Sequence, residues 1–239
     1  MHEEERRANI LDIKSEEGLR YLRSMDAKDL TTAEFDHIFK LCGALWLHSG
    51  DPKMPHAELT SGKCSNGFID VLRVLKNANL CQILARELMN KILKTWDIGV
   101  DWVVGSDHAA ATLSHSVAIW YNAQHDFTEK MPDGKQLWKR FAIMPGELVL
   151  QVEELITTTK TLQAVRNGIR EGNLWPVDFI PVVGTLVHRS DVYEFDGYPI
   201  VYFAHYDIQT WEPSECPLCK AGSKRLRPKQ NWAELIGQK

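Results

Sequence analysis

Residues 149–161 read VLQVEELITTTKT, and this stretch decides the fold. An apolar run typical of a buried strand leads into two acids, then into a threonine-rich loop, then into a pattern typical of a helix. A helix N-terminus offers unpaired N–H groups and a positive dipole end, which suit a phosphate dianion. Thr157, Thr158 and Thr161 add hydroxyl donors, while Glu153 and Glu154 can accept from ribose hydroxyls or hold a hydrated Mg²⁺. The stretch therefore predicts either a ribose 5-phosphate site or a threonine-rich helix cap beside exposed glutamates.

The same alternation extends in both directions along the chain. The pattern predicts strands at 100–104, 147–152 and 178–187, with helices at 109–123 and 161–171 between them. Strands and helices that alternate at this spacing indicate βαβ units and a parallel sheet flanked by helices. We expect an α/β fold whose ligands bind where strands end and helices begin. A helix at 77–94 precedes this unit, and an edge strand at 198–206 follows it.

The two ends of the chain have a different character. Residues 3–48 carry apolar side chains at three- and four-residue steps, and Thr31 with Glu34 fits a capping box. Residues 50–67 are rich in Pro, Gly, Ser and His, which predicts a loop or short hairpin. We expect an N-terminal helical cap at 1–48, a core at 49–206 and a C-terminal extension with a basic tail at 207–239.

Composition excludes several classes of protein. The chain has 239 residues, 44% hydrophobic and 25% charged, which is typical of a globular protein. The formal net charge of −4 gives no overall attraction to nucleic acid, and the locally basic run 220–229 is more typical of a solvated tail than of a nucleic-acid site. No apolar run is long enough to span a membrane, and residues 1–7 lack the apolar stretch of a secretory signal. A cytoplasmic location is the expectation.

Five cysteines in a chain without a signal sequence favour reduced thiols over a disulfide framework. Cys216 and Cys219 are spaced to cooperate, and their C-P-L-C turn supplies half of a tetrahedral zinc site. The sequence contains no second C-x-x-C, so His205, another side chain or a partner chain would have to complete the site. Two thiols that simply pack are the alternative, and it is the one that the sequence favours.

Residues 152–161 resemble the 5-phosphoribosyl diphosphate signature of type I phosphoribosyltransferases, and the whole pattern is closest to orotate phosphoribosyltransferases. Residues 59–70 resemble the N-terminal loop of that family, residues 103–111 its diphosphate loop, and residues 126–140 its mobile catalytic lid. The C-P-L-C tail is similar to an extension of some orotate-type sequences. The resemblance covers roughly residues 43–232, and its five weak signals occur in the family's order.

The resemblance implies a role for particular residues. Phe68 would stack on the base, Lys63 in the stretch before it would bind substrate, and Arg189 would hold the carboxylate of orotate. The remaining implied site residues are the diphosphate loop (Ser106, Asp107, His108), the lid bases (Lys130, Lys135, Lys139, Arg140) and the phosphate loop (Thr157, Thr158, Thr159, Lys160, Thr161). A purely structural role is the alternative in each case. Phe68 would be a core residue, His108 a helix cap, and Arg189 a surface ion-pair partner of Asp191.

The resemblance implies a Mg²⁺-assisted transfer of ribose 5-phosphate from 5-phosphoribosyl diphosphate to a pyrimidine-type base such as orotate, in a homodimer. Glu153 and Glu154 would hold the metal, directly or through water. The site departs from the family's pattern, because both acids are Glu, and Thr159 and Lys160 replace small residues. A left-handed backbone at Thr159 would cost about 1–2 kcal/mol. A weak or inactive nucleotide- or 5-phosphoribosyl-diphosphate-binding regulator, and a nucleic-acid accessory protein using the basic tail, remain as alternatives.

Overall fold

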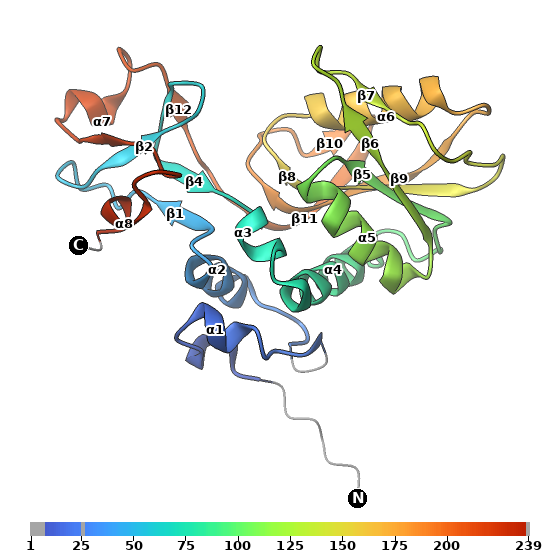
Figure 1. Cartoon of the computed structure of the whole chain (residues 1–239), viewed down its shortest axis with the longest axis horizontal. Helices are drawn as coiled ribbons and strands as arrows, with labels where there is room; N and C mark the ends of the chain where they lie inside the picture. The colour runs from blue at the N-terminus through green and yellow to red at the C-terminus, as the bar shows by residue number, and fades with distance from the viewer. Residues whose placement is uncertain (1–7, 25–26, 238–239) are drawn as a thin grey trace, which may run out of the picture.

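A seven-stranded sheet forms the centre of the larger lobe in the computed structural model, which describes residues 8–24 and 27–237 (Figure 1). Its strand order is β10-β11-β9-β8-β5-β6-β7. The five middle strands pair in parallel, and the two short outer strands pair antiparallel to their neighbours. The strands are β5 (Trp102–Ser106), β6 (Gln124–Lys130), β7 (Gln136–Leu137), β8 (Leu148–Ile156), β9 (Asp178–His188), β10 (Glu194–Phe195) and β11 (Tyr198–His205).

Helices cover both faces of this sheet. Val103 and Leu150 point into the main core with α4 (Ala78–Ile92) and α5 (Ala109–Tyr121). Their neighbours Val104 and Val149 point to the other face, where they meet α6 (Lys160–Gly172). This alternation follows from the two-residue period of a strand. The predicted α/β class, with a parallel sheet flanked by helices, is confirmed.

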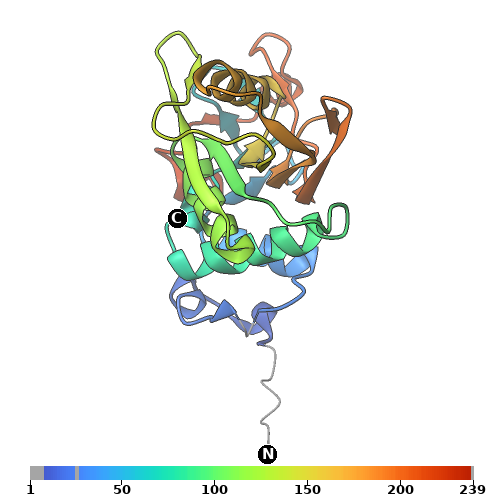
Figure 2. The same cartoon turned by 90° about the vertical axis from the view of Figure 1, so that its right-hand side faces the viewer.

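Glycine allows two close approaches in this lobe. A Cβ at Gly105 in β5 would lie 2.9 Å from the carbonyl oxygen of Val152 in β8. A Cβ at Gly168 in α6 would lie 2.1 Å from the carbonyl oxygen of Gln136 in β7. Because Gly168 has no Cβ, β7 of the β6–β7 hairpin packs directly on α6 (Figure 2).

Short helices form the N-terminal part, as the sequence predicts. They are η1 (Ile10–Asp12), α1 (Glu16–Leu19) and α2 (Thr32–Leu41), and α3 (Leu72–Leu75) leads into α4. The predicted capping box is present, because Thr31 accepts from the backbone of Glu34 while Glu34 accepts from that of Thr31. Residues 1–7 and 25–26 of the predicted cap, and residues 238–239 of the tail, lie outside the described residues.

Segments from both ends of the chain build the smaller lobe, which we call the hood (Figure 1). One of its sheets pairs β1 with β4, and the other has the order β12-β3-β2-β13. The C-terminal extension therefore packs on residues 56–69. The region boundaries at residues 48 and 206 stay a prediction. The hood elements are β1 (Leu45–Leu47), β2 (His56–Glu58), β3 (Cys64–Ser65), β4 (Gly67–Ile69), β12 (Thr210–Trp211), α7 (Pro217–Lys220), β13 (Arg225–Leu226) and α8 (Trp232–Leu235).

Two sequence-based expectations about the larger lobe are wrong. Residues 126–140 are not one mobile loop, because residues 126–130 belong to β6, which pairs with β5, and residues 136–137 form β7. Strand β8 runs to Ile156 rather than ending at 152, so both acids lie within the strand. Among the described residues, no helix is both long enough and apolar enough to cross a membrane.

Candidate active site

A cavity of about 340 Å³ opens at the carboxyl edge of the parallel sheet. The ends of β5 and β8, the first turns of α6 and the β6–β7 hairpin surround it. Ligands of open parallel sheets bind at this edge, so the cavity lies where the topology predicts a site. Its lining residues are Ser106, Asp107, Lys130, Gly134, Gln136, Glu153, Glu154, Leu155, Lys160, Thr161 and Ala164.

Glu153 is the most buried acid of the cavity, with 2% of its surface exposed. Ser106 holds the carboxylate through its hydroxyl, which donates to Oε2 at 2.7 Å, and through its backbone N–H, which donates to Oε1 at 3.3 Å. Burial, together with the nearby charge of Glu154, raises the pKa of Glu153 to about 8. The hydrogen bonds from Ser106 oppose this shift without cancelling it.

Glu154 and Asp107 add two further carboxyls. Burial, and then the charge of Asp107, raises the pKa of Glu154. Oxygen ligands of this kind are those that Mg²⁺ prefers, and a divalent cation would offset the repulsion among the three groups. The donor set therefore fits the magnesium ion that the sequence predicts at Glu153 and Glu154.

The N-terminus of α6 borders the cavity, and the side chains of Lys160 and Thr161 line it. Thr157 and Thr158 are exposed on the preceding turn and are not part of the lining. Thr159 occupies the N-cap with a φ of −78°. The left-handed strain considered for Thr159 is therefore absent, because this φ is allowed for any residue.

His108 carries the unusual backbone instead, with φ 64° at the N-cap of α5. Non-glycine residues rarely adopt positive φ, and such positions are enriched at functional sites. The imidazole is exposed, and its Nδ1 lies 3.3 Å from Oδ2 of Asp107. Ser106 and Asp107 line the cavity, whereas His108 lies beside it.

The four bases predicted for the lid are not equivalent. Lys130 lines the cavity, and Lys135 lines an adjoining hollow beyond Gln136. Lys139 and Arg140 instead form ion pairs with Glu129. The hairpin therefore presents one lysine to the cavity directly. Gln136, which sequence reasoning missed, lies beside that lysine and has a buried Oε1 without a hydrogen-bond partner among the described residues.

Arg189 follows the end of β9, next to the predicted phosphate loop. Its backbone N–H donates to the carbonyl oxygen of Ile156 at 2.8 Å. The side chain lines a second hollow of about 340 Å³ together with Asp191 and His205. In the part of the chain that the structure describes, Arg189 forms no ion pair, and its Nε is buried without a partner. The suggested surface pair with Asp191 is therefore absent.

Lys63 and Phe68 lie in the hood. Lys63 is paired with Glu212 at 3.0 Å, and Phe68 packs edge-on against Trp232. Neither side chain lines the cavity around Glu153 and Glu154 or the hollow beside Arg189, which we call the Arg189 hollow. The structure of one chain thus does not bring them together with the other predicted site residues.

Cys216 and Cys219 also lie in the hood, where they meet His56 and Cys64. No C-x-x-C motif marks the second pair, because His56 and Cys64 stand eight residues apart, a separation that matches no recognised ligand spacing. His205, considered as a further ligand, lies elsewhere, with its Nε2 3.4 Å from the hydroxyl of Tyr193.

The chain is 32% identical to orotate phosphoribosyltransferase of Caldicellulosiruptor saccharolyticus over 173 residues, which cover 72% of this chain and 87% of that protein. The chain belongs to the orotate phosphoribosyltransferase family. A second relative of the same name, from Pelotomaculum thermopropionicum, is 29% identical over 83% of this chain and 97% of its own length. No protein-family model matches the chain.

Two solved structures share the fold of this chain. UMP synthase of Leishmania donovani superimposes over 89% of this chain and 43% of its own, with a TM-score of 0.56 and 16% identity. Orotate phosphoribosyltransferase of Mycobacterium tuberculosis superimposes over 70% of this chain and 94% of its own, with a TM-score of 0.50 and 16% identity. At this identity the likeness establishes the fold alone.

Proposed function

We propose that this protein is an enzyme that transfers ribose 5-phosphate from 5-phosphoribosyl diphosphate to a ring nitrogen of orotate and releases diphosphate. One observation carries the proposal. A single cavity at the carboxyl edge of the sheet combines three carboxyls with Lys130, Lys160 and a helix N-terminus. Acceptors for a polyol therefore face donors for phosphate across one space, as a sugar phosphate requires.

The 5-phosphate would bind at the start of α6. Backbone N–H groups and hydroxyls of residues 157–161 would donate to the phosphate there, and Lys160 adds a positive charge at the cavity wall. Glu154 would accept from the ribose hydroxyls. Glu153, held by Ser106, would fix the end of β5 against β8 and complete the acidic wall.

When bound, Mg²⁺ would neutralise charge on the diphosphate and organise its oxygens. Glu153, Glu154 and Asp107 are the residues that would hold it, directly or through water. Lys130 would approach the diphosphate from the hairpin and stabilise the charge that develops as the bond to ribose breaks.

Arg189 would hold the carboxylate of orotate. A guanidinium that forms no ion pair with the described residues, and that lines a hollow at the same edge of the sheet, suits a bidentate pair with a planar carboxylate. The ring nitrogen that forms the new bond releases its proton to solvent, and the charges to be balanced are those of the orotate carboxylate and the diphosphate. Positioning and charge neutralisation therefore account for most of the catalysis that we propose.

The family resemblance also leads us to propose a homodimer. A partner chain could bring bases to the cavity that one chain does not supply. Sedimentation of the full chain with and without 5-phosphoribosyl diphosphate measures this directly, and a monomer under both conditions would refute it.

The test measures diphosphate release from 5-phosphoribosyl diphosphate and Mg²⁺ with orotate, uracil and adenine. We expect release with orotate, and a loss of roughly 10- to 100-fold in kcat/KM for orotate in Arg189→Gln, the range set by a charged hydrogen bond. Arg170→Gln, an exposed arginine on α6, is the matched control. Ligand binding without release for any base would refute the transferase and favour a regulatory binding protein.

A further inference from the structure

Four metal-ligating side chains converge in the hood, outside the proposed active site. They are His56 of β2, Cys64 of β3, and Cys216 and Cys219 at the start of α7. All four ligand atoms lie within 4.8 Å of one another. His56, Cys64 and Cys216 are fully buried, with 0% of their surface exposed. Cys216 and Cys219 are more than 150 residues from His56 and Cys64 in the sequence, so the tertiary fold brings the four side chains together.

Three of the six separations between ligand atoms are close to the edges of a tetrahedron around one zinc ion. Zn–S bonds of about 2.3 Å and Zn–N bonds of about 2.1 Å place ligand atoms about 3.8 Å apart for two sulfurs and about 3.6 Å apart for sulfur and nitrogen. The observed distance from Cys64 Sγ to Cys219 Sγ is 3.6 Å. His56 Nε2 lies 3.7 Å from Cys216 Sγ and 3.4 Å from Cys219 Sγ.

Neighbouring groups orient the ligands. The Ser223 hydroxyl donates its hydrogen to the carbonyl oxygen of Met54 at 2.6 Å, so it accepts from His56 Nδ1 at 2.8 Å. This pattern places the proton on Nδ1 and leaves the Nε2 lone pair facing the sulfurs, as in metal sites where a second group fixes the histidine tautomer. The backbone N–H of Cys219 donates to Cys216 Sγ at 3.4 Å, which stabilises a thiolate there.

A disulfide does not account for the cluster, because all the cysteines are free and the Cys64–Cys219 sulfur separation far exceeds a bond of about 2.05 Å. Three thiols and one imidazole in a tetrahedral arrangement select zinc among the common divalent ions. With four protein ligands and three of them fully buried, no coordination position is left for a substrate. The site is therefore structural.

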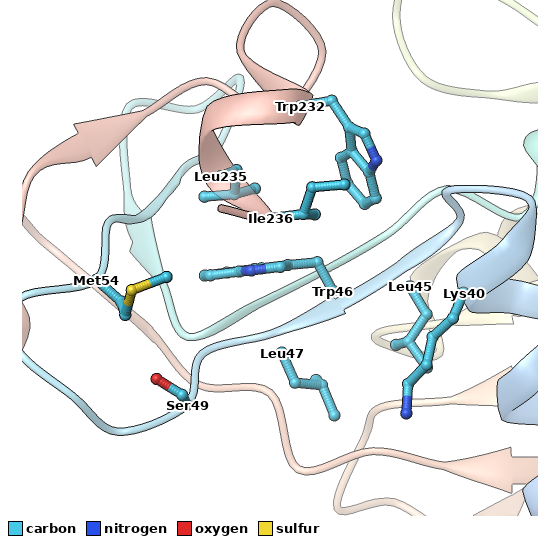
Figure 3. Close-up of a pocket in the computed structure, with 9 residues that line it drawn as sticks. All are labelled: Lys40, Leu45, Trp46, Leu47, Ser49, Met54, Trp232, Leu235 and Ile236. Atoms are coloured by element: carbon cyan, nitrogen blue, oxygen red, sulfur yellow. The ribbon is translucent and has the colours of Figure 1, made fainter. Parts of the chain in front are cut away.

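The hood has only a small apolar core to stabilise it. Its four-stranded sheet has strands of two or three residues. The associated apolar cluster consists of a few residues, centred on Trp46 and Leu235. Figure 3 shows Trp46 below the side chains of Trp232, Leu235 and Ile236 from the C-terminal segment, beside an open apolar pocket. Small lobes with so little buried surface commonly depend on a metal or a disulfide.

We propose that His56, Cys64, Cys216 and Cys219 bind one Zn²⁺ that fastens the C-terminal extension to the β2–β3 hairpin. The ion also fixes β12, because Trp211 of β12 pairs with Cys64. Trp211 lines the Arg189 hollow, so the zinc site supports one wall of the proposed base site.

The experiment measures metal content of the full chain, purified without chelators, by elemental analysis. We expect one zinc per chain. Cys64→Ser and Cys216→Ser should each reduce it to less than one tenth, whereas Cys42→Ser and Cys81→Ser, at buried cysteines outside the cluster, should retain it. Absence of zinc from the wild-type chain, with no rise in its unfolding temperature when Zn²⁺ is added, would overturn the proposal.

Cobalt keeps the proposal testable if a cysteine variant does not fold. The wild-type chain, stripped of metal and loaded with Co²⁺, should show the intense visible bands of tetrahedral cobalt and a sulfur-to-cobalt charge-transfer band. Weak octahedral bands, or zinc content unchanged in Cys64→Ser, would refute the four-ligand site. These readouts do not depend on transferase activity, so they are independent of the proposed function.

Discussion

Replacing Glu153 with glutamine should remove a pH dependence from the stability of this protein. Burial beside Glu154 raises the pKa of Glu153 from 4.5 to about 8. Between those values the folded chain retains a proton that the unfolded chain releases. The free energy of unfolding therefore falls as pH rises through this interval, because the native state binds more protons than the unfolded state.

The expected magnitude follows from the two pKa values. Each pH unit within the interval changes the free energy of unfolding by about 1.4 kcal/mol. From pH 6 to pH 8, allowing for half-titration at the upper end, the wild-type chain should lose roughly 2 kcal/mol through this carboxyl. Glutamine, like the protonated acid, has one oxygen that accepts from the Ser106 N–H and a donor group beside it. Because glutamine does not ionise in the unfolded chain, Glu153→Gln should exceed the wild type by about 2 kcal/mol at pH 6 and by about 4 kcal/mol at pH 8.

Urea unfolding of both proteins at the two pH values measures the difference. Histidines with lowered pKa values, including His125 and His188, titrate in both proteins and cancel in the comparison. Glu215→Gln, at an exposed acid, is the control and should follow the wild type. If Glu153→Gln and wild type lose equal stability between pH 6 and pH 8, the carboxyl is already ionised in the folded protein and the reasoning fails.

Three further predictions concern separate parts of the chain. Lys160→Ala should raise the KM for 5-phosphoribosyl diphosphate by roughly 10- to 100-fold, since it removes a charged donor from the cavity. Steady-state kinetics measures this, with Lys94→Ala at an exposed lysine as the control, and equal KM values for the two variants would contradict the prediction. Gly168→Ala should lower the free energy of unfolding by about 1–3 kcal/mol, because the new Cβ meets the backbone of β7. Gly99→Ala, whose Cβ enters open space, is the control, and equal thermal stability of the two variants would contradict the prediction. Thr31→Ala should lose about 1 kcal/mol of stability in urea with the capping box, and an unchanged midpoint would show that the cap contributes nothing.

Local sequence determined much of the larger lobe. Apolar runs and helical periods located four of the five parallel strands, β5, β8, β9 and β11, and the helices between them, because these elements are buried on defined faces and must show that pattern. The capping box at Thr31 was equally readable, since its two hydrogen bonds join residues three apart. The two acids and the threonine-rich loop were located on the correct strand and before the correct helix for the same reason.

Sequence was less informative where a segment depends on its partners. The polar, turn-rich residues 126–140 predicted a mobile loop, yet residues 126–130 complete the parallel sheet beside β5. The predicted strand at 147–152 ended too early, because charged side chains can occupy a strand whose carboxyl end faces a cavity, as β8 does. Pairing with a neighbouring strand outweighed local propensity in both cases.

By itself the sequence determined the α/β class, the order of the central elements and the family to which the site belongs, because periodicity and short motifs depend on neighbouring residues. Only the tertiary structure decided which charges share a cavity, that Arg189 has no ion-pair partner within residues 8–24 and 27–237, and that His56 and Cys64 meet Cys216 and Cys219. The physical reason is that burial, ion pairing and metal-ligand geometry are set by contacts between residues far apart in the chain, and no local pattern records which of those contacts form.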